Sequence, residues 1–298
     1  MDAEPRFTPI PFRPAAPGEG YFEDDALIRR VNRELIVAFS GARALLLQAA
    51  HPVMFEGFYD RTSGLADPHG RLARTATVMN TIYFGTRADA DAMTARVRRV
   101  HSRIRGELPE RAGRFPAGTP YAADDPKYLL WTLAPLFQSA DLIYRLYVGD
   151  LDRDERDALW QDHRLVGRLF GLRSGDMPAS IEEFDEYFED MVHGGELWVT
   201  PRARELGTAV VFHPPAPVHM RWLVETVNFV IVGSLPGHIR KGYGLSWDPL
   251  REALRRGGAQ YTKRVLLPLL PDLVRNTPVA GGRLIPGPPT PPRVTAAA

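Results

Sequence analysis

Residues 89–105 read DADAMTARVRRVHSRIR, and their apolar positions follow one another at intervals of four, three and four residues. These positions are Met93, Val97, Val100 and Ile104. This period predicts an amphipathic helix with one buried face. His101 falls within the apolar face, whereas the arginines of the run occupy the remaining surface. The helix is therefore expected to direct one imidazole inward and most of its charge outward.

A buried imidazole needs a partner, because leaving a buried polar group without a hydrogen bond costs about 1–3 kcal/mol. His101 can meet a hydrogen-bond acceptor in the core, or it can bind a metal, for which a neutral imidazole nitrogen is a common ligand. From the residues alone, a core histidine with a satisfied hydrogen bond is the more frequent case. The neighbouring arginines are likewise more often a solvated face than a binding site.

The run GRLART at residues 70–75 opens an earlier helical pattern, expected at 69–84. Arg71 and Thr75 share one face of this helix, and Arg74 lies on its adjoining edge. Two guanidinium groups beside a face that becomes apolar can bind an anion or polarise a bound oxygen species. The alternative is a solvated first turn, although arginine at a helix N-terminus opposes the helix dipole.

A third feature is the run QAAHP at residues 48–52. Ala44, Gln48 and His51 share one face of an apolar helix expected at 41–50. Pro52 biases His51 away from α geometry, so the helix is expected to end or kink there. His51 is a candidate distal-pocket residue or second metal ligand. A structural histidine with satisfied hydrogen bonds is again the more frequent alternative.

Helical patterns dominate residues 21–275, and no convincing run of alternating strands is found. The expected fold class is all-α, a single-domain irregular helical bundle. Its predicted helices span 24–39, 41–50, 69–84, 89–105, 125–148, 152–172, 180–193, 202–212, 218–232 and 247–270. The helix at 218–232 is strongly apolar and is expected to be buried on most sides. Residues 107–124 hold several prolines and glycines and form a long connection, of the kind that often covers a site. Residues 1–20 are expected to be an extended N-terminal segment and 276–298 a Pro-rich tail.

Composition excludes several kinds of chemistry. The 298 residues carry a net charge of +1 and no cysteine, which removes disulfides, iron–sulfur clusters and thiolate nucleophiles and gives no drive towards nucleic acid. No signal peptide and no membrane span is found, so a cytoplasmic protein is expected. Phosphate loops, nucleophile elbows and dinucleotide fingerprints are absent from the sequence. Asp190 and His193 form a single imperfect copy of a di-iron motif that must occur twice.

Several phrases occur in an order and spacing that resemble a known family. They are GARALLLQAAHP at 41–52, GRLART at 70–75, FGT at 84–86, RVRRVH at 96–101, Trp131, and LP at 235–236 followed by Arg240 and YGL at 243–245. Together they resemble the catalytic domain shared by bacterial rubber oxygenases (latex clearing proteins) and fungal mpaB-type oxygenases. The resemblance covers about residues 25–275.

The resemblance implies a helical fold enclosing a pocket for haem b, with His101 at the position of the proximal iron ligand. The run Arg71-Leu-Ala-Arg74-Thr75 matches a distal Arg-x-x-Lys-Thr motif whose lysine is replaced here by Arg74. A guanidinium stays protonated and should not ligate iron. The distal position is then expected to hold water, dioxygen or another side chain, for which His51 is a candidate. Thr132 is a second departure, because many relatives have histidine after the tryptophan.

By resemblance, Arg71 would polarise dioxygen and Thr75 would help to position it, with Arg74 beside them. The implied reaction is oxidative cleavage of a carbon–carbon double bond in an apolar, isoprenoid-like substrate. Two other interpretations stay open. The protein is a non-catalytic haem-binding or sensing protein with six-coordinate iron, or it is a cofactor-free helical scaffold. The sequence leaves substrate identity and oligomeric state undetermined.

Overall fold

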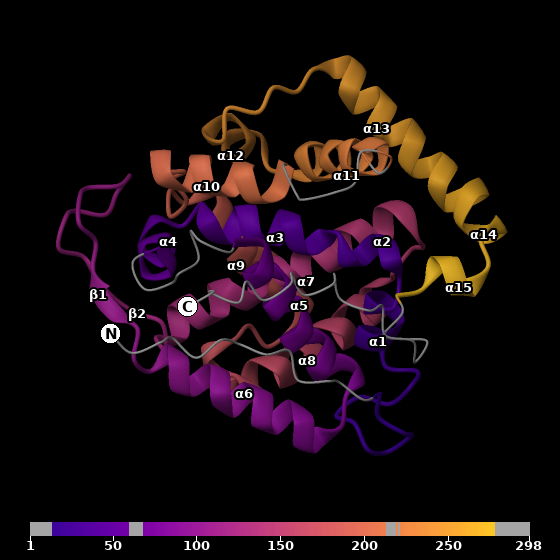
Figure 1. Cartoon of the computed structure of the whole chain (residues 1–298), viewed down its shortest axis with the longest axis horizontal. Helices are drawn as coiled ribbons and strands as arrows, with labels where there is room; N and C mark the ends of the chain where they lie inside the picture. The colour runs from indigo at the N-terminus through magenta and orange to yellow at the C-terminus, as the bar shows by residue number, and fades with distance from the viewer. Residues whose placement is uncertain (1–13, 60–67, 213–218, 220, 278–298) are drawn as a thin grey trace, which may run out of the picture.

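The helix α7 (Pro126–Tyr147) runs through the middle of the computed structural model, and the other helices are arranged around it (Figure 1). The structure describes residues 14–59, 68–212, 219 and 221–277. The Asp125 carboxylate caps α7 by accepting a hydrogen bond of 2.9 Å from the backbone N–H of Lys127. Apolar side chains on nearly all sides of α7 are buried, so this helix forms the centre of the core.

Helix α3 (Ser40–Ala49) packs directly on α7. The amide of Gln48 donates to the Thr132 carbonyl at 2.6 Å, and the buried Arg43 donates to the Ser139 hydroxyl at 2.7 Å. These contacts fix the position of α3, and therefore also the position of His51, which follows its C-terminal end.

On the other side of α7 lie α8 (Arg153–Leu169) and α9 (Ile181–His193). Aromatic side chains from the three helices form the interior here, and they are Trp131, Phe137, Trp160, Phe184 and Phe188. The rings of Phe137 and Phe184 meet edge to face with centroids 4.5 Å apart, an arrangement that aromatic pairs favour.

Helices α5 (Pro68–Phe84) and α6 (Arg87–His101) form a hairpin. The turn between them is fixed by Thr86, whose hydroxyl caps α6 by accepting a hydrogen bond of 3.1 Å from the Asp89 N–H. Beyond α6, a short antiparallel pair joins β1 (Arg105–Glu107) to β2 (Pro120–Ala122) and packs near α4 (Pro52–Tyr59).

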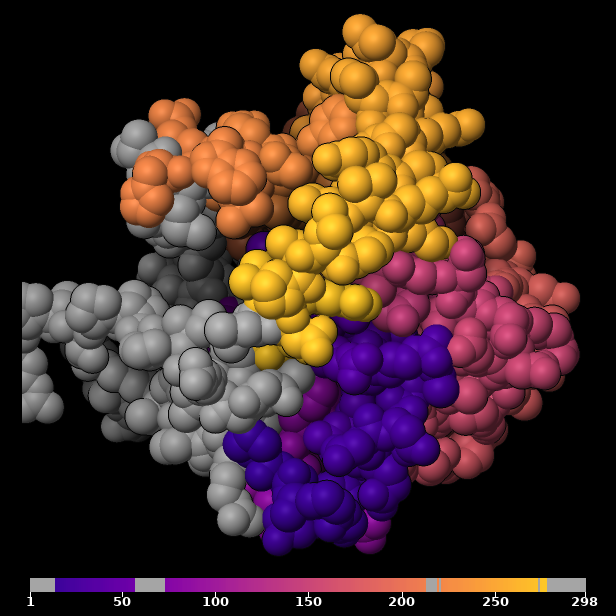
Figure 2. Space-filling view, turned by 90° about the vertical axis from the view of Figure 1, so that its right-hand side faces the viewer, coloured from indigo at the N-terminus to yellow at the C-terminus, as the bar shows by residue number. Residues whose placement is uncertain are grey.

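The C-terminal third forms a further layer over α3 (Figure 1). It consists of α10 (Pro201–Phe212), α11 (Arg221–Ser234), α12 (Gly237–Gly242), α13 (Pro249–Tyr261), a π-turn (Thr262–Leu266) and α14 (Leu267–Leu269). The following α15 (Asp272–Arg275) returns to the N-terminal α1 (Leu27–Asn32) and α2 (Leu35–Ala38), where Arg275 forms two hydrogen bonds of 2.8 Å with Glu34. Figure 2 shows the C-terminal helices as a ridge on one face of the molecule.

The all-α, single-domain prediction is confirmed, and most predicted helices are found within a few residues of their expected bounds. Two expectations are wrong. The helix expected at 24–39 is broken at Arg33–Glu34, because Glu34 is extended and pairs with Asn276. The helix near 218–232 is not buried on most sides, since Trp222 is 68% exposed. The long connection expected at 107–124 is present, and its ends contribute residues to a short strand pair.

Most of the expected terminal segments, 1–13 and 278–298, lie outside the described residues. Within the part that is described, no helix combines the length and the apolar character needed to cross a bilayer.

Candidate functional site

The α5–α6 hairpin brings four of the predicted site positions to the same end. The two helices run in opposite directions from their turn at Gly85–Thr86 and pack on each other. The last residue of α6, His101, is therefore opposite the first turns of α5, which carry Arg71, Arg74 and Thr75. These positions are far apart in the sequence, and the hairpin brings them to the same end of the two helices.

The face of α6 that packs on the protein is slightly different from the expected one. Ala90, Met93 and Thr94 are buried, Val97 is half-buried, and His101 continues this line one turn further. Val100, expected within the buried face, is 53% exposed. The helix contacts α5 and α8, and Val100 lies off the line of its buried residues, so this position turns towards solvent. The imidazole of His101 is itself half-buried.

The end of the hairpin that carries His101 presents small and partly exposed side chains. On α5, Arg74 is half-buried, whereas Ala73, Thr75 and Ala76 are exposed. Small residues on one helix and the exposed Val100 on the other leave apolar surface near a half-buried imidazole. Arg74, Thr75 and His101 are each engaged with neighbouring groups. The side chain of Arg71 lies outside the described side chains. One imidazole nitrogen is the protein ligand that a b-type haem requires, so the donor chemistry of His101 suits that group.

His51 occupies the junction between α3 and α4, where Pro52 ends one helix and begins the next, as predicted. Its ring is fully buried, with the Phe115 ring centroid 5.3 Å away and the Tyr128 ring edge-on at 5.5 Å. The backbone N–H of Met54 donates to Nδ1 at 3.4 Å, so in the neutral ring Nε2 carries the proton. Burial, with the nearby Lys127 ammonium, lowers the pKa of His51 to about 3.

Around Nε2 of His51 lies a polar group of residues that the sequence did not reveal. We call it the His51 cluster, and it consists of His51, Arg114, Lys127, Tyr187 and Glu196. The Oε2 atom of Glu196 lies 3.8 Å from His51 Nε2 and 3.7 Å from Lys127 Nζ, and its Oε1 lies 3.3 Å from Arg114. One carboxylate thus faces two cations and one imidazole N–H.

Three atoms of the His51 cluster are buried without a direct hydrogen-bond partner, namely His51 Nε2, Tyr187 OH and Glu196 Oε2. Burial, together with the charge of Glu196, raises the pKa of Tyr187, so its hydroxyl stays protonated and can donate. Such a cluster can hold a proton or a small hydrogen-bonding group. Arg114 and Phe115 come from the connection at 107–124, so that connection covers His51.

Sequence reasoning also missed His163, on the inner face of α8. It is fully buried, and its Nδ1–H donates to the Leu159 carbonyl at 2.9 Å. This leaves Nε2 as an acceptor with no partner, between the rings of Tyr83 and Phe137. Burial lowers the pKa of His163 to about 4. The spacing of Leu159, His163 and Val166 along α8 was the signal that could have found it.

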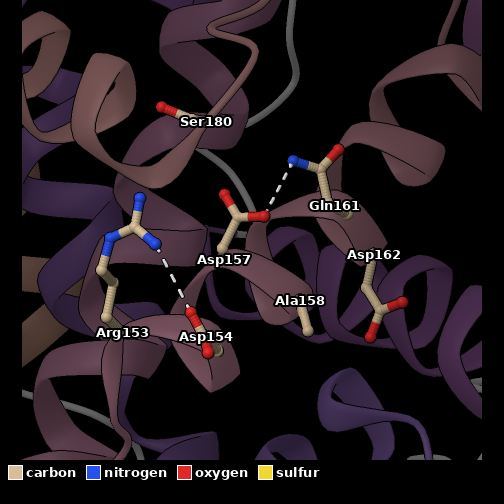
Figure 3. A pocket seen from close by; sticks show the side chains of 7 residues that line it. All are labelled: Arg153, Asp154, Asp157, Ala158, Gln161, Asp162 and Ser180. Carbon is tan, nitrogen blue, oxygen red and sulfur yellow. Dashed lines mark hydrogen bonds and ion pairs between the residues drawn. The ribbon is translucent and has the colours of Figure 1, made fainter.

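A surface pocket on α8 is lined by none of the predicted residues (Figure 3). Two of its carboxylates already accept hydrogen bonds from backbone N–H groups. Asp157 accepts from Ile181 at 2.9 Å, and Asp162 accepts from Ile28 at 3.0 Å. Across the described ranges, no group of three or more histidine and carboxylate side chains is arranged to hold a metal ion. A haem iron bound through a single imidazole needs no such group.

Comparison with known families identifies an oxygenase catalytic domain. The chain belongs to the family described as ER-bound oxygenase mpaB/B'/rubber oxygenase, catalytic domain, which matches residues 28–264. Among curated proteins, it is similar to a protein of Mycobacterium bovis and one of Mycobacterium tuberculosis, both described as uncharacterized. Each is 26% identical over 186 residues, which cover 62% of this chain and 69% of the relative. No solved structure matches.

Proposed function

We propose that this protein is a haem-b-dependent oxygenase that uses dioxygen to cleave a carbon–carbon double bond in an apolar, isoprenoid-like substrate. Membership of the oxygenase family supports the reaction class. The observation that carries the haem assignment is the position of His101. Its half-buried imidazole continues the packed face of α6 and stands opposite the α5 residues that match the distal motif.

Each residue has a defined role in this proposal. His101 would hold the iron through one ring nitrogen. Haem, when bound, supplies a redox-active iron that activates dioxygen. The guanidinium groups of Arg71 and Arg74 can donate hydrogen bonds to a polarised oxygen atom, while the Thr75 hydroxyl can help to orient it. The exposed small residues Ala73 and Ala76 leave room for an apolar substrate.

The overall reaction balances without an external reductant. The carbon–carbon double bond breaks, each carbon receives one oxygen atom of the same dioxygen molecule, and two carbonyl groups result. The protein therefore needs to bind and orient the two reactants and to exclude water, rather than to deliver electrons.

His51 enters the proposal as a candidate second contact to the haem. Its Nε2 has no direct hydrogen-bond partner and is the atom that would meet a bound group. Since burial lowers the pKa of His51 to about 3, the ring is neutral at physiological pH, and its Nε2–H is suited to donating a hydrogen bond.

The function is tested by measuring dioxygen uptake by haem-loaded protein with squalene as an isoprenoid probe, and by analysing the products for aldehydes and ketones. We expect uptake with carbonyl products and a fall of about tenfold or more in Arg74→Leu, as is typical when a donor to a developing charge is removed. Arg173→Leu, which removes an exposed guanidinium that pairs with Asp176, is the control for removing a cation elsewhere. Bound haem without dioxygen uptake would instead support a non-catalytic haem protein.

A further inference from the structure

The helical segment from α13 through the π-turn to α14 carries a stripe of exposed apolar side chains. They are Leu250 (70% exposed), Leu254 (59%), Tyr261 (60%), Val265 (41%) and Leu269 (77%). Successive members are four or seven residues apart, which keeps them on one side of a helix. The π-turn at Thr262–Leu266 has more residues per turn than an α-helix. This difference keeps Leu269 near the line of the earlier members. We call this segment, residues 249–269, the ridge.

The exposed charges within residues 249–269 are of one sign, and Arg251 also pairs at 3.3 Å with Asp248, just before the ridge. Its exposed charged residues are Arg251, Arg256 and Arg264. The only acid in 249–269 is Glu252, which is half-buried and accepts hydrogen bonds of 2.7 Å from both Arg255 and Arg256. The solvent side of the ridge therefore presents apolar side chains bordered by guanidinium groups.

The neighbouring helix also exposes a large aromatic side chain. Helix α11 packs on α13, and its Trp222 is 68% exposed. Tryptophan and tyrosine are the aromatic residues that favour the boundary between lipid and water, because each combines an apolar ring with a polar group. The ridge also stands out at the edge of the molecule (Figures 1 and 2), so a flat surface can reach it.

An apolar stripe of this length on the surface indicates an interaction site. Charge distinguishes between the possible occupants. A second copy docked face to face would bring two rows of arginines together, whereas a surface of anionic phospholipids would complement them. We propose that the ridge binds an anionic lipid bilayer, lying in the plane of the interface with its apolar stripe among the acyl chains. The proposal does not depend on haem or on turnover.

Co-sedimentation with vesicles tests this proposal on the full chain. We expect the protein to bind vesicles of phosphatidylcholine containing phosphatidylglycerol, to bind pure phosphatidylcholine vesicles more weakly, and to be released from the mixed vesicles by salt. The double variant Leu254→Glu/Leu269→Glu should bind the mixed vesicles at least about tenfold more weakly, since two leucines leave the bilayer. Arg256→Gln/Arg264→Gln should weaken binding to the anionic vesicles only.

Leu35→Glu is the matched control, because Leu35 is an exposed leucine (39%) outside the ridge. It should bind like the wild type, and circular dichroism should show that all variants are folded. Equal binding by the wild type and the ridge double variant would overturn the proposal. Failure of the wild type to bind anionic vesicles would also overturn it. In that case, a dimer seen by sedimentation equilibrium and dissociated by Leu254→Glu/Leu269→Glu would assign the ridge to a second copy of the chain instead.

Discussion

Oε2 of Glu196 lies 3.8 Å from Nε2 of His51, beneath the connection that contributes Phe115. The two residues are far apart in the sequence, at the α3–α4 junction and in the loop between α9 and α10. Three parts of the chain therefore meet around one buried carboxylate oxygen. It is the most concentrated set of buried polar atoms without direct partners in the described structure.

Replacing Glu196 by leucine should destabilise the protein by about 1–3 kcal/mol, because the N–H of His51 and the cations of Lys127 and Arg114 lose the carboxylate that they face. Urea unfolding at neutral pH measures the change. Glu189→Leu is the control, since Glu189 forms an exposed pair with His193 and should matter little. Equal stability of the two variants would contradict the described cluster.

The stability of the protein should fall as the pH is lowered below about 6.5. Burial lowers the pKa of His51 to about 3 and that of His163 to about 4, whereas both titrate near 6.5 in the unfolded chain. Below pH 6.5 the unfolded state therefore binds protons that the folded state does not, so the stability that these groups contribute is present above that pH. It is lost at about 1.4 kcal/mol per pH unit for each histidine, until the folded ring also titrates.

His163→Leu should remove one of these two contributions and flatten the decline. Urea unfolding of both proteins between pH 7 and pH 5 measures the two slopes, with His193→Leu, at an exposed position, as the control. Parallel slopes for wild type and His163→Leu would show that His163 is not buried as a neutral ring.

Gly106→Ala should disturb the strand pair. A Cβ at Gly106 would meet the hydroxyl of Tyr121 and lie 2.6 Å from its Cζ, and the Tyr121 side chain is buried, which limits its movement. We expect a loss of about 1–3 kcal/mol and faster amide exchange in β1 and β2. Gly41→Ala, where nothing lies within 4 Å of the added Cβ, should instead be neutral or slightly stabilising. Unchanged exchange in Gly106→Ala would count against the strand register.

Arg275→Gln should cost about 3–5 kcal/mol, because it leaves the carboxylate of Glu34, which is 1% exposed, without its bidentate partner. Thermal or urea unfolding measures the loss. Arg251→Gln removes an arginine from an exposed pair with Asp248 and should change stability by less than about 1 kcal/mol. A similar small effect for Arg275→Gln would show that α15 does not close the bundle in solution.

Local signals were sufficient for the helices that are bounded by a clear start or stop residue. α3, α5 and α9 fall close to their predicted bounds because Pro52, Gly85 and Ser180 mark their ends. The break between α1 and α2 could not be predicted, since it depends on the pairing of Glu34 with Asn276 and Arg275, far along the chain. Helix α11 is apolar in sequence, yet its burial depends on which neighbours cover it.

The candidate site was likewise predictable from the sequence only in part. Helical spacing identified His101, and the structure keeps that residue on the packed line of α6 while moving Val100 outside it. His51 was singled out from a local motif. Its partner Glu196 lies in a loop with no pattern of its own, so only the tertiary fold could bring the two together. The roles of Arg71, Arg74, Thr75, His51 and His101 towards haem remain predictions.

The central claim is that the imidazole of His101 holds a haem iron, and a titration of purified protein with haemin, followed by its absorption spectrum before and after reduction, tests it most directly. We expect a Soret band at one haem per chain in the wild type and in His193→Ala. In His101→Ala the band should be lost, or shifted to that of weakly held haem. An unchanged spectrum in His101→Ala, or no Soret band in the wild type, would contradict the account.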